Sequence, residues 1–159
     1  MEIIIGNLLD SKEKYIAHQA NCVTTNSAGI AKLIFDKFPH SDVYSNRTSP
    51  DTPGSIKVMG NGNSERYVIN MFSQYYPGKS KYIDSELDGI LARQKYFHRS
   101  LQRIAKIENI ESIALPWRIG CGLGGGDWEW YLGTIVNFSK YISDTQNAKC
   151  YIYKREGDE

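Results

Sequence analysis

The chain has 159 residues, of which 41% are hydrophobic and 23% charged, as expected for one globular domain with a sizeable core. The 19 basic against 18 acidic residues give a net charge of +1, which argues against binding to duplex nucleic acid or an anionic membrane. No His, Cys, Asp or Glu cluster has metal-ligand spacing, so we expect no metal, and we expect no cofactor. The 3 cysteines leave one unpaired, which indicates a reducing, cytoplasmic location, or a nuclear one in a eukaryote. We expect neither a signal peptide nor a membrane-spanning run.

The first half of the chain predicts four strands and one helix. Short apolar runs indicate the strands, and the apolar spacing within residues 30–38 indicates a helix that Asn26 or Ser27 can cap. Gly-Asn-Gly-Asn at residues 60–63 predicts a hairpin. In chain order we expect strands 2–5 and 15–20, helix 28–38, a helical turn at 41–47, and strands 55–59 and 66–72.

The second half predicts two more strands and two more helices. After a polar and aromatic loop at 73–82, an apolar stripe predicts a long helix from about residue 85 to residue 108, with Ser85 and Asp88 as a variant capping box. Strand 112–115, helix 128–142 and strand 149–154 complete the chain.

This order of elements predicts a three-layer α/β/α sandwich around a mixed, mostly parallel sheet of about six strands. Ligands in such sheets bind at the carboxyl ends of the strands. We therefore expect the loops 6–10, 21–27 and 116–127 to meet at one edge of the sheet.

The stretch 115–130 (LPWRIGCGLGGGDWEW) joins an expected strand to an expected helix and contains 5 glycines. Glycines let main-chain N–H groups approach a ligand, and a helix N-terminus favours negative charge. We expect a phosphate or diphosphate cradle, with a mobile glycine-rich turn as the alternative.

Two named motifs fit this region and the preceding loop poorly. Residues 120–125 match G-x-G-x-x-G without a second βαβ half, and residues 78–80 lack the earlier P-loop glycine, because position 73 is Ser73.

Three segments, taken together, carry a family resemblance. The first is IGNL at residues 5–8, and the second is AHQAN at 17–21 followed by SAGIA at 27–31. The third is Pro116 with IGCGL at 119–123. In this order and spacing they resemble the macrodomain family, the ADP-ribose-binding fold. The resemblance implies one macrodomain over residues 1–159. It is closest to a small branch that contains ADP-ribose 1″-phosphate phosphatases and ADP-ribosyl-ester hydrolases.

The resemblance implies a role for each matching residue. Asn7 and Leu8 would border adenine, and Asn21 would hydrogen-bond the distal ribose. The remaining residues would surround the distal ribose and the diphosphate, and they are Gly29, Ile30, Ile119, Gly120, Cys121, Gly122 and Leu123.

The sequence departs from the family pattern at two places. Asn7 stands where the family has an adenine-contacting aspartate, and Gly124 stands where the ester hydrolases have an acid. The catalytic lysine of those hydrolases would fall near Lys79 or Lys81. The acid of the loop in this chain is Asp127, three residues further on.

Each candidate for chemistry has a structural alternative. His18 suits general acid–base work or a buried, hydrogen-bonded place in the core. Asp127 suits a catalytic base, a helix N-cap, or both. Cys121 is either a nucleophile or, the interpretation we favour, a small residue in the loop. Three aromatic residues could stack on adenine but more commonly pack in a core or loop, and they are Tyr75, Tyr76 and Trp117.

We therefore predict a monomer that binds ADP-ribose or a derivative and hydrolyses a group on the distal ribose, with the 1″-phosphate first. His18 or Asp127 would position or activate water. The alternatives are a mono-ADP-ribosyl hydrolase that acts on ADP-ribosylated protein or nucleic acid, and a non-catalytic ADP-ribose reader.

Overall fold

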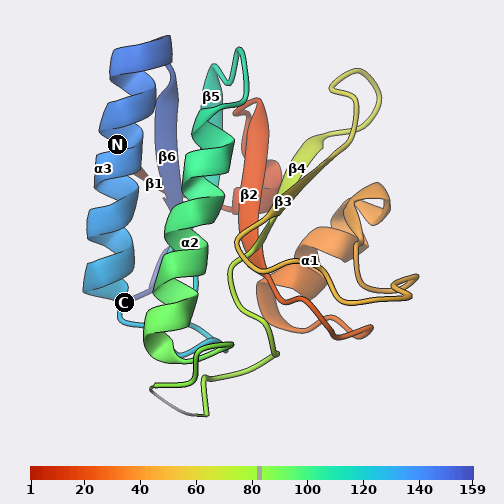
Figure 1. Ribbon diagram of the computed structural model, residues 1–159. Coiled ribbons are helices and arrows are strands. Elements are labelled where there is room, and N and C mark those ends of the chain that lie inside the picture. Colours follow the sequence, from red (N-terminus) through yellow and green to blue (C-terminus); the bar gives the residue numbers. More distant parts are fainter. Residues whose placement is uncertain (82–83) are drawn as a thin grey trace.

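A six-stranded sheet organises the computed structural model, which describes residues 1–81 and 84–159 (Figure 1). Tyr82, the end of the predicted 73–82 loop, lies outside the described residues. The strands are β1 (Glu2–Ile5), β2 (Tyr15–Ala20), β3 (Ile56–Met59), β4 (Tyr67–Phe72), β5 (Ser112–Pro116) and β6 (Lys149–Lys154). Their order is β1-β6-β5-β2-β4-β3, and each neighbouring pair is parallel except β3 with β4. The predicted mixed, mostly parallel sheet is confirmed.

Helices cover both faces of this sheet, as the three-layer prediction requires. They are α1 (Gly29–Lys37), α2 (Ile90–Ala105) and α3 (Trp128–Gln146). Figure 1 shows α2 and α3 side by side over one face, with α1 apart from them. Successive side chains of a strand point to opposite faces, so Val68 enters the core beneath α1 and Ile69 enters the core beneath α2 and α3.

The helix predicted over residues 85–108 is shorter at both ends. The N–H of Asp88 donates to Ser85 Oγ at 3.3 Å, as in a cap, but the Asp88 carboxylate binds Arg93. The chain therefore turns once more, and α2 begins only at Ile90. At its other end the N–H of Lys106 donates to the carbonyls of the last turn, which closes the helix.

The turn predicted at residues 41–47 is also displaced. A 3₁₀ helix covers Pro39–Ser41, and Asp42 Oδ1 then accepts from the N–H groups of Tyr44 and Ser45 at 2.8 and 3.1 Å. A short polar side chain has here replaced a helical turn with its own local turn. Within the described ranges, no helix is long and apolar enough to cross a membrane, and no three His, Cys, Asp or Glu residues are grouped to hold a metal.

Candidate ligand-binding site

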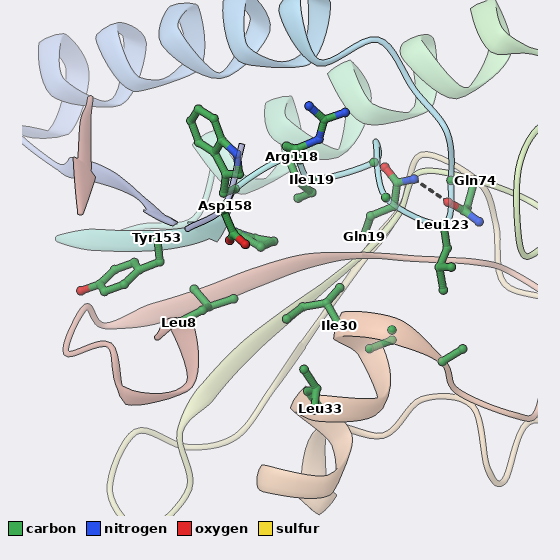
Figure 2. A pocket seen from close by; sticks show the side chains of 18 of the residues that line it. Leu8, Gln19, Ile30, Leu33, Gln74, Arg118, Ile119, Leu123, Tyr153 and Asp158 are labelled. Carbon is green, nitrogen blue, oxygen red and sulfur yellow. Dashed lines mark hydrogen bonds between the residues drawn. The ribbon is translucent and has the colours of Figure 1, made fainter. Parts of the chain in front are cut away.

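A cavity of about 680 Å³ opens at the carboxyl ends of the parallel strands (Figure 2). Small-molecule sites typically measure ~300–1,000 Å³. The loops after β1, β2 and β5 all reach this cavity, as their positions in the sheet predict. Of the predicted binding residues, all except Cys121 line it: Asn7, Leu8, Asn21, Gly29, Ile30, Ile119, Gly120, Gly122 and Leu123.

The glycine loop between β5 and α3 is closed by its own main chain. The N–H of Gly126 donates to the Gly120 carbonyl at 2.9 Å, and the N–H of Cys121 donates to the Arg118 carbonyl at 2.8 Å. Gly120 has a φ of 78°, and a Cβ there would lie 2.8 Å from the ring of Tyr131. Only glycine satisfies both the backbone conformation and this close approach.

The same loop leaves a row of main-chain donors without partners. Among the described residues, the N–H groups of Gly120, Gly122, Leu123 and Gly124 have no hydrogen-bond partner, and all four residues line the cavity. Successive unpaired N–H groups of this kind favour anions. Cys121 is different, because its N–H is used inside the loop, so its predicted main-chain contact with a ligand has no free donor.

The N-terminus of α1 lies against this loop. A Cβ on Gly29 would come within 2.9 Å of Leu123 Cδ1. The N-cap residue is Ala28, with no side-chain hydrogen bond, so the predicted cap by Asn26 or Ser27 is wrong. Those residues lie upstream of the position from which a side chain can reach the helix. The first N–H groups of α1 therefore remain available, together with the positive end of the helix dipole.

Asn21 combines a structural contact with a free donor. Its Oδ1 accepts from the N–H groups of Val23 and Thr24 at 3.1 and 2.9 Å. Buried Arg47 donates to the Asn21 carbonyl at 2.9 Å and pairs with Asp51 at 3.1 Å, which holds the loop. No partner of Asn21 Nδ2 is found in the described chain, and Asn21 lines the cavity. Its amide nitrogen can therefore donate to a ligand.

A buried arginine ties two loops at the rim of the cavity together. Arg93 is 3% exposed and pairs with Asp88 at 2.7 Å. Its guanidinium donates to the carbonyl of Gly78 at 2.7 Å and to those of Tyr76 and Gly124 at 3.2 Å. This one side chain therefore positions residues 76–78 against the glycine loop.

Two glutamines line the cavity beside the glycine loop (Figure 2). Gln19 Nε2 donates to Gln74 Oε1, and Gln74 Nε2 donates to the Tyr76 carbonyl at 2.8 Å. The Tyr76 carbonyl can only accept, which fixes the direction of this chain of hydrogen bonds, and Ser73 Oγ donates to Gln19 Oε1 at 2.7 Å. The sequence prediction missed both glutamines. The available signal was their place at the carboxyl ends of β2 and β4.

A second group of missed residues follows β6. Tyr153, Asp158 and Glu159 line the cavity, and Trp117 Nε1 donates to the Glu159 carbonyl at 2.8 Å. Because β6 is parallel to β5, its carboxyl end reaches the same edge of the sheet, so the rule used for the other loops would have found this segment. Of the three aromatic candidates, Trp117 lines the cavity, whereas Tyr75 and Tyr76 are not among its lining residues.

His18 lies in the core and does not line the cavity. Its Nε2 donates to Asn70 Oδ1 at 2.7 Å, and its ring meets that of Phe35 edge-on at 5.4 Å. Burial lowers the pKa of His18 to about 4, so the ring is neutral at pH 7. This placement favours the core alternative and lends no support to acid–base work on a ligand.

Asp127 and Cys121 also lie outside the lining of the cavity. Asp127 caps α3, with its carboxylate accepting from the N–H of Glu129 at 3.1 Å, which confirms the predicted cap. The Cys121 thiol donates to the Ile119 carbonyl at 3.4 Å, and burial raises its pKa to about 11. A neutral thiol is a poor nucleophile, so this geometry agrees with the structural interpretation of Cys121.

The part of the chain that contains the start of α1 and the glycine loop matches a known protein family. A family model described as Macro domain matches residues 17–132. The chain belongs to the Macro domain family. The match runs from within β2 to the first turn of α3, so it includes the start of α1 and the glycine loop. Residues 5–8 and the segment after β6 lie outside it. The narrower branch suggested by the IGCGL form stays a prediction.

Individual proteins share sequence or fold with this macrodomain. An uncharacterized 17.5 kDa protein from the tk–vs intergenic region of Enterobacteria phage T4 is 25% identical over 140 residues, which cover 84% of this chain and 85% of that protein. The macrodomain of Thermus aquaticus DarG superposes with a TM-score of 0.70 at 21% identity, over 96% of this chain and 97% of that one. The Trypanosoma brucei macrodomain, in complex with ADP-ribose, superposes with a TM-score of 0.66 at 12% identity, over 97% and 63%.

Proposed function

We propose that this macrodomain binds ADP-ribose or a derivative, with the diphosphate between the glycine loop and the start of α1. The observation that carries the proposal is the row of N–H groups at residues 120 and 122–124, which have no partner within residues 1–81 and 84–159 and lie opposite the uncapped helix that begins at Gly29. Main-chain donors and a helix dipole stabilise phosphate oxygens without a charged side chain. The Trypanosoma brucei macrodomain, which shares the fold, holds ADP-ribose.

The other lining residues suit the rest of such a ligand. Asn21 Nδ2 would donate to a hydroxyl of the distal ribose, since an amide nitrogen is a donor and this one has no competing partner among the residues that the structure describes. Leu8 and Tyr153 would pack against the base at the opposite end (Figure 2). ADP-ribosylated macromolecules would present the same group to the cavity.

The test is a thermal-shift panel of ADP-ribose, ADP-ribose 1″-phosphate, NAD, AMP and ATP. A ligand that binds only the folded state raises the melting temperature by mass action. At a ligand concentration of one hundred times the Kd, the free energy of unfolding rises by about 2.7 kcal/mol. We expect ADP-ribose and its 1″-phosphate to give the largest shifts. A shift with NAD or ATP but none with ADP-ribose would overturn the proposal.

Hydrolysis at the distal ribose is the second candidate function, and Lys79 favours it. The hydrocarbon stem of Lys79 lies along Gly125, where a Cβ would come within 2.7 Å of Lys79 Cγ. An ammonium carried at the glycine loop would stabilise the negative charge that develops on a departing phosphate or carboxylate. Lys79 lies outside the lining of the cavity, as His18 and Asp127 do. It takes priority because it is exposed beside the glycine loop, whereas His18 is buried and Asp127 caps α3.

The second candidate is tested by product release. Parent protein, Lys79→Met and Lys81→Met are incubated with ADP-ribose 1″-phosphate and with an ADP-ribosylated protein ester. Lys81 is an exposed neighbour, so its variant controls for a lost surface charge. We expect release by the parent and by Lys81→Met and a loss of about 10²-fold or more in Lys79→Met. Binding without release in the parent would instead identify a reader.

A further inference from the structure

The two ends of the cavity differ in hydrogen-bonding character. The glycine loop and the start of α1 present N–H donors, whereas the segment after β6 brings the acidic residues Asp158 and Glu159 to the lining, together with Arg155. Figure 2 shows Asp158 on the side of Tyr153 and Leu8, with Gln19 and Gln74 at the other end. A carboxylate repels phosphate, so Asp158 suits a hydrogen-bond donor at its own end of the cavity and not the diphosphate.

The Asp158 carboxylate is held in place by its own turn. Its Oδ2 accepts from the N–H of Arg155 at 3.0 Å, and the N–H of Asp158 donates to the Arg155 carbonyl at 3.1 Å. The bond from Trp117 Nε1 to the Glu159 carbonyl attaches this turn to the loop after β5. In the described part of the chain, Asp158 Oδ1 has no partner, so it is a positioned acceptor without a donor.

Asn7 offers the complementary group. Its Oδ1 accepts from the N–H of Leu9 at 3.0 Å as the cap of the short helix that follows, and Asn7 lines the cavity. The cap holds that oxygen toward Leu9, and the amide nitrogen is the group that can donate to a ligand. Asp158 is a lining carboxylate on this side and can accept from the amino group of a base.

We propose that Asp158 makes the cavity selective for a base with an exocyclic amino group, adenine rather than hypoxanthine. The inference rests on the proposed binding of ADP-ribose and names the residue that reads its base. Adenine presents an amino donor beside a ring-nitrogen acceptor, which matches a carboxylate acceptor and the amide donor of Asn7. Hypoxanthine presents a carbonyl and a ring N–H in those places, so its oxygen would face the carboxylate.

The experiment compares ADP-ribose with its hypoxanthine analogue by calorimetry on the whole chain. We expect the parent protein to prefer adenine by at least about tenfold, the effect of one hydrogen bond to a charged group. Asp158→Asn keeps an oxygen for the N–H of Arg155 and can turn an NH₂ toward a carbonyl, so the preference should fall toward one. Glu156→Gln removes an exposed acid from the same turn, outside the lining, and should keep the parent's preference.

The ratio of the two affinities separates recognition from structural support. A variant that merely loosens the turn, or removes repulsion from the diphosphate, changes both affinities by the same factor. Equal binding of the two ligands by the parent, or an unchanged ratio in Asp158→Asn, would overturn the inference and leave the binding proposal standing. Failure of the parent to bind ADP-ribose at all would overturn both.

Discussion

At the scale of single residues, Asn21 shows how one side chain can hold a turn and still have a donor available for a ligand. Its oxygen holds the turn at Val23 and Thr24, and its nitrogen has no partner among the described residues. Replacing Asn21 by alanine would therefore remove two effects at once. Asn21→Asp separates them, because a carboxylate still accepts both turn hydrogen bonds but cannot donate.

We predict that Asn21→Asp weakens ADP-ribose binding by about 1–3 kcal/mol, the cost of a lost hydrogen bond to a buried partner. AMP lacks the distal ribose and should lose much less. Asn26→Asp places the same new charge on another lining residue and controls for repulsion of the diphosphate. Calorimetry of the three proteins decides the matter. Equal losses for ADP-ribose and AMP would show that Asn21 acts through the loop or through charge.

The second prediction concerns His18, whose buried ring has a pKa of about 4 against an ordinary value of 6.5. The unfolded chain binds a proton below pH 6.5 that the folded protein takes up only near pH 4, so stability is lost as the pH falls through this window. The loss reaches up to about 3 kcal/mol. Urea unfolding should show a steeper decline between pH 6.5 and pH 4 for the parent than for His18→Gln, and the same slope in both would contradict the prediction.

At the scale of elements, some glycines of the loop are required by its backbone conformation, and others keep space free for a ligand. Gly120 has a positive φ, and a Cβ on it would meet the ring of Tyr131 at 2.8 Å, whereas a Cβ on Gly122 would meet nothing within 4 Å. Both line the cavity. The two positions therefore allow loop stability and ligand binding to be tested separately.

We predict that Gly120→Ala lowers the stability of the unliganded protein by about 1–3 kcal/mol, through backbone strain and the contact with Tyr131. Gly122→Ala should leave that stability within ~0.5 kcal/mol. It should nevertheless weaken ADP-ribose by about 1 kcal/mol, because its methyl group enters space that the ligand needs. Melting curves with and without ADP-ribose measure both effects. A stable Gly120→Ala protein would show that the loop has an alternative conformation.

At the scale of the whole molecule, the cavity is built from segments that are far apart in the chain. Bound ADP-ribose should therefore slow amide hydrogen exchange together in residues 6–10, 29–31 and 119–124, because one ligand restrains all three. The 134–141 segment of α3 contributes Thr134, Asn137, Phe138 and Tyr141 to a separate groove beside α2, and this segment serves as the internal control. Protection confined to one of the three segments would contradict a ligand that spans the cavity.

The sequence alone determined the elements of the fold and much of the candidate site. Apolar periodicity and glycine punctuation are local signals, and they predicted the six strands, the three helices and the loop after β5. The alternation of strands and helices implied parallel neighbours, and parallel strands place their carboxyl ends at one edge. That is why loops as distant as 6–10 and 116–127 could be predicted to meet.

Only the tertiary structure decided which partner each polar group would take. Asp88 binds Arg93 instead of capping a helix, the N–H of Cys121 is used within its own loop, and the ring of His18 is enclosed by Asn70 and Phe35. Asp158 reaches the cavity because β6 ends beside β5. A local pattern shows what a side chain can bond, but several partners compete for it, and the folded chain alone determines which of them lies within hydrogen-bonding distance.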